Sequence, residues 1–343
     1  MKKYLNTLFI TTQGAYLSKE GETVVVSVEK ETKLQVPIHT LSGIVCFGQV
    51  GMSPFLMGFC AENNVAVSFL TEYGRFLASI RGKVSGNVLL RREQYRRADD
   101  ERFCQQITKS FLTGKFANGR SVLRRSLRDH RDKINAEAVE ASALRLTYAI
   151  GQLERNYTLD ELRGLEGDSA HSYFSVFDHL IVAQKDDFKF EERNRRPPLD
   201  NVNCLLSFIY TLMMHDIRSA LETVGLDPAV GFLHRDRPGR SSLALDMMEE
   251  FRPFLADRLV LSLINLCQVD KKGFKKSDSG AVMMNDETRK IVLVAYQTRK
   301  QEEITHPFLN EKISVGLLSY AQALILARFL RGDIDGYPVF IWK

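Results

Sequence analysis

The chain has 343 residues, a formal net charge of +5, 44% hydrophobic residues and 26% charged residues. This is the composition of an ordinary globular protein, and it excludes a disordered or low-complexity chain. No run of 18 apolar residues occurs, so no membrane-spanning helix is expected. The amino terminus carries two lysines and a short apolar run without a cleavage site. We interpret it as a first strand, not as a signal peptide.

The five cysteines are scattered and form no CxxC motif, so neither a zinc ribbon nor a disulfide framework is indicated. A reduced cytoplasmic protein is the expectation. No GxSxG, P-loop, GxGxxG or HExxH motif occurs. Serine hydrolase, nucleotide-binding and zinc hydrolase chemistries are therefore not favoured.

The first part of the chain has the pattern of short strands. Apolar residues alternate at Val24, Val26 and Val28 and at Val65, Val67 and Phe69. Turn signals stand at Gln13-Gly14, Glu20-Gly21 and Tyr73-Gly74. The segment SPFLMGFCAENN predicts one short helix, with Ser53 as N-cap and Pro54 at the first helical position. We predict a small β-rich domain over residues 1–88.

From Leu89 onward the apolar spacing is helical and β-branched residues become rarer, which predicts a mostly α-helical domain over residues 89–343 and an α+β fold. Residues 91–133, which include Arg124 and Arg125, carry a net charge of +7, against +2 for the first 88 residues. This segment is either a solvated helix face or a stripe that binds nucleic-acid phosphates.

A second basic cluster, RNRRPPLDN at 193–201, precedes a strongly apolar helical segment. Its two prolines fix an extended backbone, and three arginines on such a stiff segment suit phosphate recognition better than a linker. These arginines are Arg193, Arg195 and Arg196. A third cluster, at 270–280, has the composition of a mobile basic loop.

An acidic residue stands on an inward helical face in LRGLEGDSAHSYF, residues 162–174. Glu166 shares that face with Leu162, Leu165, Ser169, Ala170, Tyr173 and Phe177. A carboxylate on an inward face is costly unless it is paired or coordinates a metal. Glu166 therefore needs a partner.

Candidate partners lie between Gly225 and Pro253. Ser241 or Ser242 can cap a helix on which Asp246 and Glu249 are spaced i, i+3, so that both can project toward one point. His234 precedes them on a Gly- and Pro-rich loop. Glu166, His234, Asp246 and Glu249 around one point would suit Mg²⁺ or Mn²⁺ and leave coordination positions for water and phosphate.

Other interpretations of the same residues stay open. A lone His beside a turn is commonly a structural hydrogen-bond donor. Carboxylates near a helix start can favour the helix dipole. Glu249 and Glu250 near Arg252 can be a surface ion pair that contributes little. Spacing alone does not decide between these alternatives.

Three longer segments resemble the CRISPR-associated adaptation integrase family, which inserts new spacers into CRISPR arrays. They are GLEGDSAHSYF, RNRRPPLDNVNCLLSFIYTLMMHDIRSALETVGLDPAVGFLH and SLALDMMEEFRPFLADRLV. The wording of HRDRPGRSSLALDMMEEFRP and of the closing LARFLRGDIDGYPVFIWK is similar to the type I-C branch. The resemblance is specific from about residue 160 to the carboxyl end and looser before it.

The resemblance implies roles for individual residues. Glu166, His234 and Glu249 would be the metal ligands and catalytic residues, and Asp246 a neighbouring acidic position of less settled role. His234 could instead carry a proton to the leaving oxygen. His215 matches no ligand of the motif, and we expect it to pack in the helix or core.

The family's activity is a metal-dependent transesterification. A DNA 3′-hydroxyl attacks a phosphodiester of the array, and DNA cleavage is a related activity. The resemblance implies Mg²⁺ or Mn²⁺, double-stranded and branched DNA, a homodimer and a small companion adaptation protein, with no membrane partner. Two alternatives remain: a structure-selective repair nuclease, and a DNA-binding scaffold in which the acidic residues only stabilise the fold.

Overall fold

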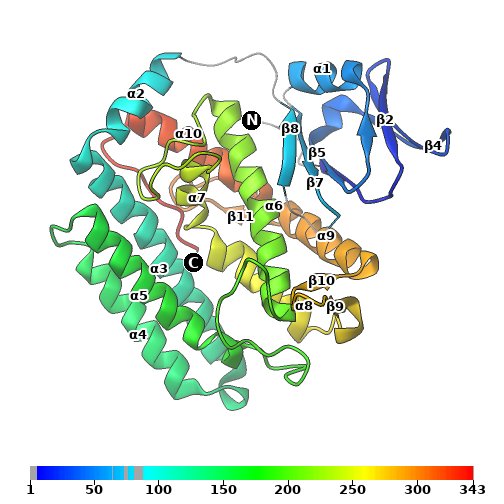
Figure 1. Cartoon of the computed structure of the whole chain (residues 1–343). Coiled ribbons are helices and arrows are strands. Elements are labelled where there is room, and N and C mark those ends of the chain that lie inside the picture. The colour runs from blue at the N-terminus through cyan, green and yellow to red at the C-terminus, as the bar shows by residue number, and fades with distance from the viewer. Residues whose placement is uncertain (1–5, 64, 73–75, 81–87, 343) are drawn as a thin grey trace.

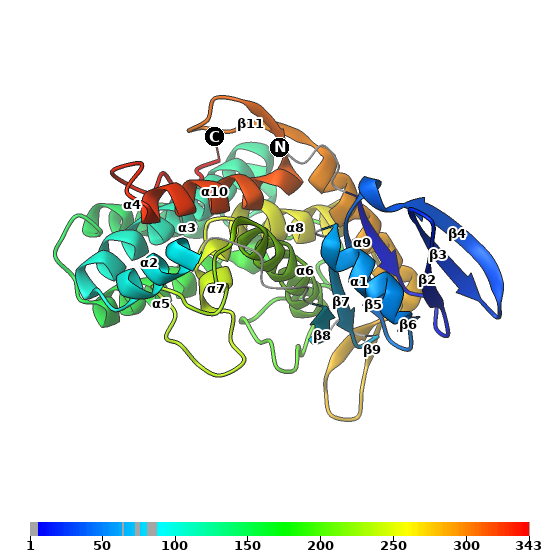
Figure 2. The ribbon, with the colours of Figure 1, turned by 90° about the horizontal axis from the view of Figure 1, so that it is seen from above.

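The computed structural model describes residues 6–63, 65–72, 76–80 and 88–342. It confirms the predicted α+β fold, with the strands first and the long helices after them. Seen from above, the β-rich part lies at one end of an elongated molecule and helices α2 to α5 lie at the other (Figure 2). Among the described residues, no helix is both long and apolar enough to cross a membrane.

Two four-stranded sheets form the β-rich part. One has the order β1-β5-β7-β8, with β1, β5 and β7 parallel and β8 antiparallel to β7; the other has the order β4-β3-β2-β6. The strands are β1 Asn6–Ile10, β2 Tyr16–Glu20, β3 Thr23–Val28, β4 Glu31–Pro37, β5 Leu41–Phe47, β6 Gly51–Met52, β7 Ala66–Leu70 and β8 Phe76–Ile80.

Local sequence signals account for the connections in this part. The predicted short helix is α1, Pro54–Glu62, and the Ser53 hydroxyl accepts a hydrogen bond from the Leu56 amide, so the predicted cap is confirmed. Gly14 and Gly21 adopt positive φ angles at the predicted turns. The third turn signal, at Tyr73-Gly74, lies outside the described residues.

The helices follow from Val88 (Figure 1). They are α2 Val88–Ala98, α3 Glu101–His130, α4 Ala136–Gln152, α5 Leu159–Ser175, α6 Asn201–Val224, α7 Ser242–Met248, α8 Arg258–Asn265, α9 Asp286–Gln301 and α10 Leu318–Leu330. A π-helical turn, Arg252–Asp257, separates α7 from α8. Short 3₁₀ turns occur at Ile38–Thr40, Arg131–Lys133, Phe177–Leu180, Lys271–Gly273 and Val315–Leu317. Two hairpins complete the chain: β9 Phe274–Lys276 with β10 Val282–Met284, and β11 Glu303–Thr305 with β12 Lys312–Ser314.

The basic segment at 270–280, predicted as a loop, contains a 3₁₀ turn and one strand of a hairpin. Residues 274–276 and 282–284 pair as an antiparallel hairpin, and the Val282 amide also donates to the Pro198 carbonyl oxygen over 2.8 Å. Val282 and Met284 bury one side of β10, which packs the hairpin against α6. The loop prediction missed this strand because three-residue strands are too short to detect in a lysine-rich sequence.

The sheets and helices share one large apolar core. Val45, Phe47 and Leu70 belong to the same buried cluster as the helices, and the Phe47 and Phe208 ring centroids are 5.9 Å apart. A second, smaller core lies between the two sheets and α1. Strands reach Ile80 and the first long helix begins at Val88, while the domain boundary at residue 88 stays a prediction.

The carboxyl-terminal segment is fixed by a buried acid. The Glu250 carboxylate is 0% exposed and accepts hydrogen bonds from the Tyr337 hydroxyl (2.6 Å), the Phe340 amide (2.6 Å) and the Gln322 amide group (2.9 Å). Asn118 of α3 donates to the Glu250 and Phe340 carbonyl oxygens. Hydrogen bonds to Glu250 and Asn118 therefore hold the carboxyl-terminal segment around Tyr337 and Phe340 against α3.

This burial makes stability depend on pH. Burial raises the pKa of Glu250 to about 7 from 4.5. The native state then binds more protons than the unfolded chain between these values, so the contribution of Glu250 to the free energy of unfolding falls as pH rises through this window, by about 3 kcal/mol at most. We expect E250Q, which cannot titrate, to gain stability relative to the wild type between pH 5 and pH 7.

Urea denaturation of both proteins at pH 5 and pH 7 measures this difference, since other titrating groups are common to both. An exposed-site control, E140Q, should keep a constant difference. The account is contradicted if the E250Q difference is the same at both pH values.

Candidate catalytic site

Helix α5 carries Glu166 at the place that the sequence predicted. Thr158 and Glu161 form a capping box at its start, with the Thr158 amide donating to Glu161 Oε2 over 2.7 Å. The face formed by Leu162, Ser169 and Tyr173 is buried, as expected. Glu166 lies at the edge of this face, and its side chain is 29% exposed. The Glu166 carboxylate therefore lies beside the buried face of α5, as predicted, but it is only partly buried.

The partner of Glu166 is Lys115 of α3. The Lys115 ammonium hydrogen bonds to Glu166 Oε1 and forms an ion pair with Glu249 Oε2 over 2.8 Å. Burial lowers the pKa of Lys115, but the charges of Glu249 and Glu166 outweigh this effect and raise it above its ordinary value. The sequence analysis placed Lys115 in a basic stripe and did not identify it as a partner.

Glu249 is the more deeply buried of the two acids that contact Lys115. It follows α7 directly, its side chain is 2% exposed, and Arg252 contacts its second oxygen, Oε1, over 2.9 Å. Burial tends to raise the pKa of Glu249, but the charges of Arg252, Lys115 and His234 lower it to about 2. The alternative of a weak surface pair at Glu249, Glu250 and Arg252 is wrong, because both glutamates are buried.

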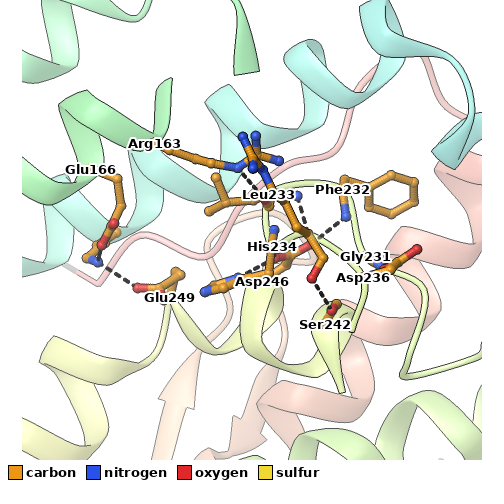
Figure 3. A network of polar contacts seen from close by, with 12 residues as sticks. Arg163, Glu166, Gly231, Phe232, Leu233, His234, Asp236, Ser242, Asp246 and Glu249 are labelled. Atoms are coloured by element: carbon orange, nitrogen blue, oxygen red, sulfur yellow. Dashed lines mark hydrogen bonds and ion pairs between the residues drawn. The ribbon is translucent and has the colours of Figure 1, made fainter. Parts of the chain in front are cut away.

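Asp246 orients the loop that carries His234. Its Oδ2 atom accepts from the Phe232 and Leu233 amides over 2.6 and 3.0 Å. Its Oδ1 atom accepts from the His234 amide over 3.0 Å and contacts His234 Nδ1 over 2.6 Å. Since a carboxylate accepts, Nδ1 is the donor, and Nε2 of the neutral ring keeps its lone pair. Figure 3 shows this arrangement around Asp246.

Other elements hold the His234 loop against the helices. Gln94 of α2 is 0% exposed, and its side chain bonds to Asp227 and Val230 of the loop. Arg163 of α5 donates to the Leu233 carbonyl oxygen over 2.8 Å. Ser241 occupies the N-cap position of α7, but no side-chain hydrogen bond caps this helix. The Ser242 hydroxyl instead donates to the Arg235 carbonyl oxygen. The predicted serine cap was therefore wrong.

The four predicted residues meet in one region, but with different roles. Glu166 and Glu249 share a cation, while Asp246 faces backbone amides and His234, so the i, i+3 pair does not point at one atom. No group of three His, Cys, Asp or Glu side chains in the described part of the chain is already gathered around a point as in a metal cluster.

The donor set nevertheless suits a hard divalent cation. Two carboxylates already converge on a positive charge, and an imidazole oriented by a carboxylate offers Nε2, which is the usual support of a metal-bound His. Glu166, Glu249 and His234 would hold the ion, and Asp246 would position His234. His215 is buried on α6, as expected, and burial lowers its pKa to about 4.

The arginines predicted to bind nucleic acid have unequal surroundings. Arg195 and Arg196 are exposed and line a groove between α6 and β10. Arg193 donates to Asn203 Oδ1 over 2.6 Å and to Ser207 over 3.1 Å, so its guanidinium is tied to α6. Arg124 and Arg125 are exposed on α3, and Arg125 contacts Asp129 over 3.3 Å.

The His234 loop adds basic residues that the sequence analysis missed. Burial lowers the pKa of Arg240, and Arg237, Arg195 and Arg196 lower it further, against the opposing charge of Asp246. The guanidinium groups of Arg237, Arg195 and Arg196 are therefore close enough to Arg240 to repel its charge. The sequence HRDRPGR shows that these residues are basic, but only the folded chain brings this loop near the RNRR segment.

Comparisons with known proteins place this chain in a family. Residues 8–298 match the family described as CRISPR associated protein Cas1. The CRISPR-associated endonuclease Cas1 1 of Chlorobaculum tepidum is 58% identical over 343 residues, and the match covers 100% of both chains. The chain belongs to the Cas1 family. The CRISPR-associated endonuclease Cas1 2 of Rhodospirillum rubrum is 50% identical over 351 residues, again with 100% of both chains covered.

Solved structures share the Cas1 fold. A CAS1 protein from Thermotoga maritima has a TM-score of 0.81 at 24% identity, covering 98% of this chain and 100% of that one. A casposase bound to integration product has a TM-score of 0.85 at 21% identity, covering 99% and 95%. At these identities the likeness concerns the fold, and it confirms the β-rich and helical arrangement.

The role of Asp246 can be tested through stability. D246A leaves the amides of Phe232, Leu233 and His234 without their acceptor in a buried place, which should lower the free energy of unfolding by about 3–5 kcal/mol. S241A, which removes no cap hydrogen bond, should change it by less than about 0.5 kcal/mol. Chemical denaturation measures both, and a D246A loss below about 1 kcal/mol would contradict the assignment.

Proposed function

We propose that this Cas1-family chain is a metal-dependent DNA endonuclease and integrase of CRISPR adaptation. The observation that carries the proposal is the convergence of Glu166 and Glu249 on one positive charge, beside an imidazole oriented by Asp246. The relatives at 58% and 50% identity are named CRISPR-associated endonucleases, which supports a nuclease activity. We propose Mg²⁺ or Mn²⁺ as the ion, because two carboxylates and one imidazole suit hard cations that retain water.

The chain's own groups prepare the site for phosphoryl transfer. When bound, the cation polarises a phosphoryl oxygen and stabilises charge on the attacking and leaving oxygens. Arg252 holds one oxygen of Glu249, so that the other oxygen stays directed toward Lys115 and Glu166. Asp246 fixes the His234 ring with Nε2 available as a ligand. A DNA 3′-hydroxyl as nucleophile gives integration, and water gives cleavage.

DNA would be held by the basic surface beside this site. Arg195, Arg196 and Arg237 repel the charge of Arg240, and a phosphate backbone would relieve this repulsion. Such contacts position the duplex without reading its bases. Arg124 and Arg125 would extend the surface along α3, whereas Arg193 supports α6.

We further propose a homodimer that assembles with a small companion adaptation protein in the cytoplasm. A solved Cas6-RT-Cas1–Cas2 complex contains a chain of the same fold, with a TM-score of 0.83 at 20% identity over 99% of this chain and 36% of that one. Its name supports an assembly of this kind.

Strand transfer tests the proposal. Purified protein, with and without the companion, receives a supercoiled array plasmid and a labelled short duplex with 3′-hydroxyl ends, in Mg²⁺, Mn²⁺ or EDTA. We expect joining only with metal and none with E166A, because this change removes a ligand. Lys115 keeps its contact with Glu249 in E166A, so the free energy of unfolding should change by no more than about 1 kcal/mol.

A matched control is D168A, which removes an exposed acid two residues further along α5 and should join DNA normally. Cleavage of branched DNA without joining would favour a repair nuclease. Tight DNA binding with no joining or cleavage, and with no effect of metal, would favour a scaffold and contradict the catalytic proposal.

A further inference from the structure

Lys115 occupies the point where the two proposed acidic ligands converge. Its ammonium contacts Glu166 of α5 and Glu249 at the end of α7, while the lysine itself belongs to α3, so three separate elements meet there. The Lys115 side chain is only 12% exposed. Among the residues that the structure describes, Lys115 is the cation that contacts both carboxylates.

The charges of Glu166 and Glu249 are already balanced without a metal. Arg252 contacts Glu249 Oε1 and Lys115 contacts Glu249 Oε2 and Glu166, so two cations face two carboxylates. Two unit positive charges about 4 Å apart repel by about 4 kcal/mol at the effective dielectric constant near a protein surface, and a divalent ion doubles this. The ammonium and a divalent cation therefore cannot share the position between the carboxylates.

We propose that Lys115 is the resident counter-cation of the site: it holds Glu166 and Glu249 in place before a metal ion binds, and it moves away when the ion arrives. This inference rests on the proposed function. Lysine suits the role because its ammonium is a compact charge on a flexible stem, whereas the planar guanidinium of Arg252 keeps a fixed contact.

A cavity beside Lys115 gives the displaced side chain a place to go. The cavity has a volume of about 30 Å³, which is room for one water-sized group such as an ammonium. Ser169, Tyr210 and Asp257 are among its lining residues. Asp257 is 1% exposed and its Oδ1 atom accepts from the Tyr210 hydroxyl over 2.5 Å. Ser169 and Asp257 thus offer oxygen acceptors to an ammonium that leaves the metal ligands.

The consequence is a competition that lowers the apparent affinity for metal. If the lysine-bound state holds 90–99% of the metal-free protein, removal of the ammonium tightens binding about 10- to 100-fold. We expect K115M and K115Q to bind Mn²⁺ that much more tightly than the wild type. Without metal both variants should melt at a lower temperature, since Glu166 loses its partner, and Mn²⁺ should raise their melting temperature more than that of the wild type.

The experiment is calorimetric titration of the full chain with Mn²⁺ alone, in the absence of DNA, together with thermal melting. K115R keeps the positive charge and should stay within a few-fold of the wild type. K109M is the matched control, because Lys109 lies on the same helix and donates to the Arg155 carbonyl oxygen, away from the carboxylates.

The outcomes separate this inference from the proposed function. If the wild type binds Mn²⁺, E166A does not, and K115M or K115Q binds equally or more weakly than the wild type, Lys115 is not a competing counter-cation, while the metal site stands. If neither the wild type nor any Lys115 variant binds Mn²⁺, the metal-dependent function itself fails. Tighter binding in K115Q alone is sufficient support if K115M does not fold.

Discussion

The compensation of buried negative charge is the constraint on which this structure depends. Glu249 is almost fully buried at the end of α7, and it is tolerated there because Arg252 and Lys115 each contact one of its oxygens. Lys115 comes from α3 and also contacts Glu166 of α5. The packing of α3 against α5 and against the π-helical turn therefore brings the proposed ligands together, and stability and chemistry share the same contacts.

Three acids within five residues show how surroundings decide the role of a carboxylate. Asp246 accepts backbone amides and orients His234, and Glu249 faces cations that lower its pKa to about 2. Glu250 faces neutral donors of the carboxyl-terminal tail, and burial raises its pKa to about 7. One acid thus positions a ligand, one is suited to bind an ion, and one holds the tail over α3.

Local patterns predicted much of the fold. The cap at Ser53, the turns at Gly14 and Gly21, and the inward face around Glu166 follow from short-range sequence signals, and the structure confirms them. The hairpin at Phe274–Lys276 was missed because its pairing and its contact with Pro198 are not visible in a short lysine-rich segment.

The site was predicted less completely than the fold. Spacing selected Glu166, His234, Asp246 and Glu249, and the resemblance to a known family implied three of them as ligands. The partners of these residues lie far away in the sequence. Lys115 is 51 residues from Glu166, so no spacing rule connects them. The Asp246 carboxylate faces the amides of Phe232, Leu233 and His234 and not Lys115. This orientation depends on the path of the loop, which the sequence does not show. Charge pattern alone could not separate Arg193, which supports α6, from its exposed neighbours Arg195 and Arg196.

The most direct test of the central claim is a crystal structure of the protein soaked in Mn²⁺, with anomalous scattering used to locate the ion. The account predicts one anomalous peak within about 2.0–2.3 Å of oxygens of Glu166 and Glu249 and of His234 Nε2. It also predicts that the Lys115 ammonium has left the carboxylates, while Asp246 still contacts His234 Nδ1. A fully ordered Lys115 between Glu166 and Glu249, with no manganese peak there at millimolar Mn²⁺, would contradict it.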